Sequence, residues 1–114
     1  MATLAIDPIL PPVPPKEECP HFTLTRGRVM FTVLPSKKDC YFELWWFLHE
    51  CTPEQRHLAA CVAAEYWDKR ARDLWHLIAA ARDCAERTRL FGEAGMYHSA
   101  REGWREYGRT DNHA

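Results

Sequence analysis

The sequence predicts an α+β fold, in which a small antiparallel β-meander packs on a long helix. Apolar and polar residues alternate over much of residues 21–48, the pattern of two or three half-buried strands. A helical repeat of apolar residues then runs without Gly or Pro over residues 53–90. A glycine-containing turn precedes a second helical repeat over residues 94–107, so the two helices are expected to form an antiparallel hairpin. The chain of 114 residues is long enough for one such domain.

The first 20 residues contain six of the eight prolines. The run over residues 11–15 (PPVPP) predicts extended polyproline II structure, so residues 1–20 are expected to form a proline-rich arm. Pro11, Pro14 and Lys16 also match the P-x-x-P-x-K spacing that SH3-type domains bind. A plain packed or flexible arm explains the same residues.

The strands are expected on either side of two turns. The alternation of apolar residues changes parity at Gly27, which indicates a tight turn or a bulge. Residues 35–39 (PSKKD) have the composition of a second turn. Residues 40–48 (CYFELWWFL) are rich in aromatic residues, which favours a third strand.

The long helix has a clear start. Thr52 can cap it, Pro53 suits the first helical position, and Gln55 completes a capping box. A helix over residues 53–90 would be ~57 Å long at ~1.5 Å per residue, which exceeds the diameter of a compact domain of ~100 residues. The helix is therefore expected either to break near the charged run 68–73 or to form a long spine with different partners along its length.

Residues 91–95 (FGEAG) indicate the stop of the long helix and a turn. Large aromatic residues of the second helix would then face an alanine-rich stripe of the first. The expected neighbours are Tyr97 with Ala85, and Trp104 with Ile78 and Leu74.

One domain is expected over residues 21–108, between the arm (1–20) and a polar tail (109–114). The start lacks the features of a secretory signal, and no apolar stretch approaches the ~20 residues of a membrane span. The odd number of cysteines, five, favours reduced thiols. We therefore expect a cytoplasmic protein without membrane contact.

The chain contains no phosphate loop, dinucleotide-binding glycine pattern, nucleophile elbow or zinc-protease motif. We expect no enzymatic activity, no catalytic residue and no cofactor. His49, Cys51, His57 and Cys61 are of the types that structural zinc prefers. The paired Cys-x-x-Cys motifs of strong zinc sites are missing, so no metal is assigned and the question stays open.

The net charge of −1 argues against nucleic acid or an anionic membrane as the main partner. Arg26, Arg28, Lys37 and Lys38 nevertheless gather at the two expected turns, and aromatic residues of a small sheet could stack on unpaired bases. These four residues are candidate partner-binding residues. A nucleic-acid-associated or zinc-stabilised regulatory domain is the alternative function.

Adjacent tryptophans raise the question of a partner. In a strand, Trp45 and Trp46 would point to opposite faces, so both faces of the third strand would be apolar. One face would pack on the long helix, and the arm or another chain would cover the other. Trp75 flanks the alanine-rich stripe of the long helix. We expect these three tryptophans to bind a partner, and the argument for the first two fails if residues 40–48 are helical.

Together these features predict a small protein-binding module that inhibits or modulates another protein by occupying its surface. A small chain without catalytic motifs is typical of accessory proteins with which phages and mobile elements antagonise host machinery or defence. A homodimer through the long helix is a further kind of partner that the sequence leaves open.

Overall fold

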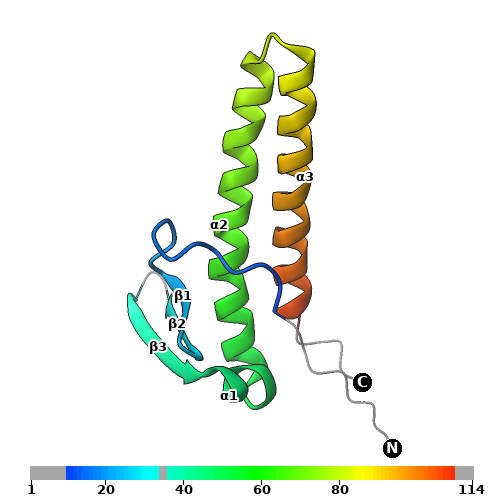
Figure 1. The fold of residues 1–114 in the computed structure, drawn as a ribbon. Helices are drawn as coiled ribbons and strands as arrows, with labels where there is room; N and C mark the ends of the chain where they lie inside the picture. Colours follow the sequence, from blue (N-terminus) through cyan, green and yellow to red (C-terminus); the bar gives the residue numbers. More distant parts are fainter. Residues whose placement is uncertain (1–9, 34–35, 110–114) are drawn as a thin grey trace, which may run out of the picture.

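The computed structural model describes residues 10–33 and 36–109 and has the α+β architecture that the sequence predicts (Figure 1). The strands are β1 (Phe22–Thr25), β2 (Arg28–Val33) and β3 (Lys38–Glu43), which form one antiparallel sheet in that order. The helices are α1 (Leu44–His49), α2 (Pro53–Ala80) and α3 (Cys84–Tyr107). The sheet lies beside one end of the α2–α3 hairpin, and the other end of the hairpin extends beyond it (Figure 1).

A two-residue turn joins the first two strands. Arg26 and Gly27 both have a positive φ, 51° and 75°, as the type I′ turns of tight hairpins require. The resulting register places most apolar residues of the three strands on the face that packs against α2. These residues are Phe22, Leu24, Val29, Phe31, Val33, Cys40 and Phe42. The turn at Gly27 is therefore confirmed, and it sets which face of the sheet is buried.

The third strand ends earlier than predicted. Residues 44–48 form α1 instead of continuing β3, so the expectation that Trp45 and Trp46 lie on opposite faces of a strand is wrong. The backbone N–H of Leu44 donates to the carbonyl oxygen of Gly27 (2.6 Å), where the chain turns away from the sheet. The helical turn buries Phe47 completely against the inner face of the sheet. Burial of this ring outweighs the strand preference of an aromatic-rich segment.

The outer face of the sheet is largely polar, contrary to the expectation of two apolar faces. It consists of Thr23, Thr25, Arg28, Met30, Thr32, Asp39, Tyr41 and Glu43. Thr32 donates a hydrogen bond to Asp39 (2.9 Å), and Arg28 pairs with Glu43 (3.4 Å). This face therefore does not need the apolar cover that the sequence analysis expected.

The helical hairpin is confirmed, but its turn lies at residues 81–83. Of the two alternatives for the long helix, the break near residues 68–73 does not occur, since this segment lies within α2. The stop expected at residues 91–95 is wrong, since that segment lies within α3. Leu90 and Ala94 are buried against α2, so packing keeps the intervening Gly92 helical.

The earlier turn changes the register between the two helices. Tyr97 stacks on Trp67 with ring centroids 5.4 Å apart, and Trp104 meets Phe22 edge-on at 5.0 Å. The predicted neighbours of both aromatic residues are therefore wrong. Leu74 and Ile78 pack instead with Leu90 and Ala94 in a small core cluster.

The described part of the arm, from residue 10 onward, crosses the helical hairpin (Figure 1). The carbonyl oxygen of Pro12 accepts hydrogen bonds from two indole nitrogens, those of Trp67 (3.0 Å) and Trp104 (2.7 Å). Pro14 is buried. Further along the arm, Glu18 accepts hydrogen bonds from Tyr66 (2.6 Å) and Arg70 (2.8 Å) of α2. Within the P-x-x-P-x-K segment, Pro12 and Pro14 are thus held in the fold, whereas Lys16 is exposed.

Within residues 10–33 and 36–109, none of the helices is both long and apolar enough to cross a membrane. All five cysteines are free thiols.

Candidate functional site

The four basic residues of the predicted partner site lie at opposite ends of the sheet. Arg26 lies in the β1–β2 turn and Arg28 begins β2, whereas Lys37 precedes β3 and Lys38 is its first residue, at the other end of β2. The two ends of β2 are about 17 Å apart at ~3.4 Å per residue. Arg28 is also paired with Glu43 (3.4 Å). The structure therefore does not combine the four residues into one basic surface.

Trp45 and Trp46 differ in their surroundings. Trp46 is half-buried and stacks on Phe42, with ring centroids 4.6 Å apart. Trp45 is 62% exposed and lies against the ring of His49 (4.8 Å). Only Trp45 of this pair offers a largely free aromatic surface, at the end of the molecule that holds α1 (Figure 1).

Trp75 belongs to a cluster of three rings near the α2–α3 turn. Its indole N–H donates to Nε2 of His98 (3.0 Å), and its ring meets Phe91 edge-on with centroids 5.3 Å apart. Trp75 and Phe91 remain 42% and 45% exposed. We call Trp75, Phe91 and His98 the distal aromatic patch.

The position of the distal aromatic patch follows from the burial of the residue that precedes each aromatic residue on its helix, Leu74 before Trp75 and Leu90 before Phe91. Leu74 on α2 and Leu90 on α3 point into the seam between the helices. One residue further along an α-helix is a rotation of about 100°, so Trp75 and Phe91 flank the seam. Their mutual contact shows that they flank it on the same side.

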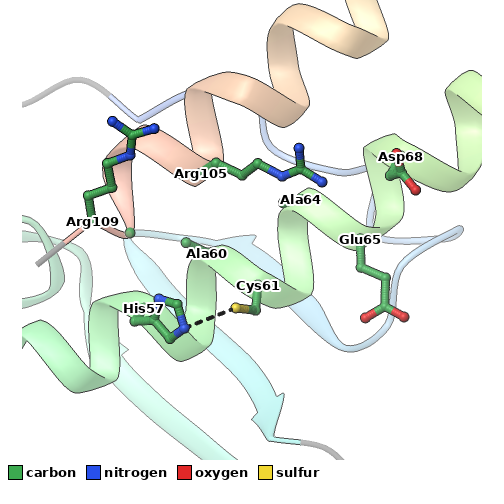
Figure 2. A pocket seen from close by; sticks show the side chains of 9 residues that line it. His57, Ala60, Cys61, Ala64, Glu65, Asp68, Arg105 and Arg109 are labelled. Atoms are coloured by element: carbon green, nitrogen blue, oxygen red, sulfur yellow. Dashed lines mark hydrogen bonds between the residues drawn. The ribbon is translucent and has the colours of Figure 1, made fainter.

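A groove opens between α2 and the end of α3 (Figure 2). Its volume is about 600 Å³. On the α2 side the groove is lined by His57, Cys61, Glu65 and Asp68. On the other side it is lined by Arg105 of α3 and by Arg109, which follows the C-cap of α3; the small residues Ala60, Ala64 and Gly108 complete the lining. A Cβ atom added to Gly108 would lie 2.5 Å from that of Ala60, so the two helices are in close contact here.

A thiol and an imidazole face each other in this groove. Sγ of Cys61 lies 3.5 Å from Nε2 of His57, one helical turn earlier on α2. Nearby, Asp68 accepts a hydrogen bond from Arg101 (2.7 Å) and pairs with Arg72 (3.2 Å). The hydrogen bond from Arg101 is the main reason that the pKa of Asp68 is below its usual range.

The four possible zinc ligands do not converge. Cys51 is buried and donates to the carbonyl oxygen of Phe47 (3.0 Å), whereas His57 and Cys61 line the groove. His49 packs on Trp45. In the part of the chain that the structure describes, no group of three or more His, Cys, Asp or Glu side chains could hold a metal ion.

Comparisons with protein-family models, curated proteins and solved structures find no match to this chain. Its function has to be argued from the geometry of its surfaces.

Sequence reasoning missed Phe91 and His98 as partners of Trp75. The two residues are seven positions apart, which places them on one face of a helix. That signal has meaning only if residues 91–95 are helical, whereas the two glycines of this segment predict a turn. Arg105 and Arg109 were missed because their position opposite Cys61 depends on the α2–α3 turn.

Proposed function

We propose that this protein is a small non-enzymatic module that binds another protein through its distal aromatic patch. Trp75 and Phe91 come from different helices, are held by their mutual contact and by the hydrogen bond to His98, and still expose almost half of their surface. Exposed aromatic residues on a rigid scaffold are typical anchors of protein interfaces, because they bury a large area and lose few rotatable bonds. This arrangement is the observation that supports the proposal.

The position of the patch suits an inhibitor or modulator. It lies on the half of the hairpin that extends beyond the sheet and the arm, so a partner can approach it freely (Figure 1). Binding there would cover part of the partner's surface without any chemical step. We infer that the partner belongs to host machinery or defence, as expected for an accessory protein of a phage or mobile element.

The proposal can be tested by comparing what single variants retain from cells of the native host. The full chain, Trp75→Ala, Phe91→Ala and the control Tyr41→Ala, at an exposed aromatic residue of the sheet, are immobilised, and retained proteins are quantified by mass spectrometry. We expect a protein that the full chain and Tyr41→Ala retain equally, and that both patch variants lose at least tenfold, which corresponds to about 1.4 kcal/mol. Equal retention by all four samples would contradict the proposal, provided that circular dichroism shows them folded.

The alternative of a nucleic-acid-associated domain has less support. Arg28 pairs with Glu43, and the two pairs of basic residues lie at opposite ends of the sheet. Binding of single-stranded DNA and RNA over a salt series separates the two functions. Tight binding that falls steeply with salt would favour the alternative.

A further inference from the structure

We propose that Cys61 is a site of reversible modification by small disulfides that carry carboxylate groups, the class to which glutathione disulfide belongs. The inference rests on the groove between α2 and α3, which joins a thiol–imidazole pair to two arginines. Cys61 is about 21 Å along α2 from Trp75, at ~1.5 Å per residue, so this site is separate from the distal aromatic patch. It does not depend on the proposed function.

The first argument is the geometry of the thiol. His57 and Cys61 are one turn apart on α2, and their side chains approach to 3.5 Å. In the tautomer that carries its proton on Nδ1, His57 can accept the thiol proton through Nε2. Both side chains are exposed in the groove, so a small reagent can reach Sγ. A thiolate is the form of cysteine that attacks disulfides.

The second argument is the contrast with the other cysteines. Cys51 is buried and bonded to a backbone carbonyl, and burial raises the pKa of the Cys19 thiol. Cys40 faces the core side of the sheet. Cys84 is exposed, but the residues four positions before and after it are Ala80 and Thr88, so its own helix supplies no imidazole. Cys61 is the exposed cysteine with a base beside it.

The third argument is the opposite wall of the groove. Arg105 lies on α3, and Arg109 follows the C-cap residue Gly108; both line the groove that the thiol also lines (Figure 2). Their ion pairs with Glu102 (3.0 Å) and Glu106 (3.2 Å) are exposed and therefore weak, so a ligand carboxylate can replace them. Guanidinium groups bind carboxylates in a charge-assisted, often bidentate manner.

The floor of the groove leaves room for such a ligand. Its residues are small, Ala60, Ala64 and Gly108. Asp68 also lines the groove, but Arg101 and Arg72 are paired with it and offset its negative charge. Glu65 adds one carboxylate on the α2 side, so the cationic side of the groove is that of Arg105 and Arg109, where the carboxylates of a small disulfide can bind.

The reaction is a thiol–disulfide exchange. His57 takes the proton of Cys61, and the thiolate attacks one sulfur of the small disulfide. A bond forms between Sγ and that sulfur while the original S–S bond breaks. The electron pair of the broken bond leaves with the second sulfur of the reagent, which becomes a thiolate. This thiolate then takes the proton from His57. Cys61 is oxidised to a mixed disulfide, and half of the reagent is reduced to a thiol. Excess thiol reverses the reaction.

The test measures rates of modification in the reduced full chain. Glutathione disulfide is added, and mass spectrometry of the intact protein and its peptides gives a rate constant for each cysteine. We expect Cys61 to react first, and His57→Gln to slow Cys61 about tenfold while the rate at Cys84 stays the same. Cys84 is the matched internal control, because it is also exposed but has no imidazole one helical turn away. Faster reaction at Cys84, or an unchanged rate at Cys61 in His57→Gln, would overturn the proposal.

A second reagent tests the role of the arginines. Arg105→Gln and Arg109→Gln should slow the reaction of Cys61 with glutathione disulfide several-fold, because they remove guanidinium groups that bind its carboxylates. Bis(2-hydroxyethyl) disulfide has no charge, so its reaction with Cys61 should stay at the same rate in both variants. Equal slowing with both reagents would show that the arginines act on the fold of the groove, and would refute the assignment of carboxylate-bearing ligands. Unfolding curves of each variant establish that it is folded before its rates are compared.

Discussion

The contact between Gly108 and Ala60 decides whether the end of α3 is held against α2, and Gly108→Ala tests it directly. An added Cβ would lie 2.5 Å from Cβ of Ala60 and 3.5 Å from the backbone Cα of His57. Carbon atoms in optimal contact are ~3.5–4.0 Å apart, so the two helices would have to separate by about 1 Å. The two atoms that the new Cβ would meet, Cβ of Ala60 and Cα of His57, are fixed to the backbone of α2, so no flexible side chain can absorb this movement.

The magnitude follows from two opposing effects. Overpacking of this kind costs about 1–3 kcal/mol, while replacing a helical Gly by Ala favours folding by up to ~1 kcal/mol. Gly108 is the C-cap residue of α3, so only part of the helical gain applies. We expect Gly108→Ala to reduce the free energy of unfolding by ~1–2 kcal/mol, and to lower Tm by roughly 5–10 °C in a domain of this size.

Thermal and urea unfolding of the full chain, followed by circular dichroism, measures this change. Gly95→Ala is the matched control, because an added Cβ there meets no atom within 4 Å; it should stabilise the protein by about 1 kcal/mol. Combining Gly108→Ala with Ala60→Gly removes the clash, so the double variant should be more stable than the two single effects added together. A stabilising Gly108→Ala, or an additive double variant, would refute the close approach of α3 to α2 and the described floor of the groove.

Three further changes test contacts elsewhere. Trp104→Phe removes the indole N–H that donates to Pro12 and leaves a small cavity. The free energy of unfolding measured in urea should therefore fall by about 1–3 kcal/mol. An unchanged midpoint of urea unfolding would contradict the role of this bond in holding the arm. Because the hydrogen bond from Arg101 lowers the pKa of Asp68, the carboxylate stabilises the fold above its ordinary pKa and this stabilisation is lost as pH falls through the lowered value. The difference in Tm between the wild type and Asp68→Asn should therefore shrink between pH 7 and pH 2, and a constant difference would contradict the coupling. Burial raises the pKa of Tyr107 to about 12. The neutral hydroxyl therefore stabilises the fold fully below pH ~10, and this contribution falls as pH rises toward 12. Tyr107→Phe should flatten the alkaline decline of Tm, and a curve parallel to that of the wild type would argue against a buried hydroxyl.

Features that depend on a few neighbouring residues could be predicted from the sequence. Thr52 and Gln55 form the predicted capping box, in which each side chain bonds the other residue's backbone N–H (2.9 and 3.1 Å). Gly27 forms the predicted tight turn with a positive φ. Both motifs are complete within four residues, so no distant part of the chain is needed to specify them.

The candidate sites could not be predicted in the same way. Trp75 was singled out as a partner-binding residue, which stays a prediction, but the rings around it were not identified. His57 and Cys61 were considered only as zinc ligands. The arginines opposite them lie far away in sequence, and helical periodicity within one helix carries no information about the register between two helices.

The sequence by itself determined the class of the fold, the strand parities and the start of the long helix, because alternation, helical repeats and caps are local. Tertiary packing decided where the helices turn and where the third strand ends. Residues 81–83 contain neither Gly nor Pro, yet the chain turns there because Leu74 and Ile78 can then pack on Leu90 and Ala94. The distal aromatic patch and the groove both follow from that register, since burial energy gained over the whole hairpin outweighs the local preference of two glycines for a turn.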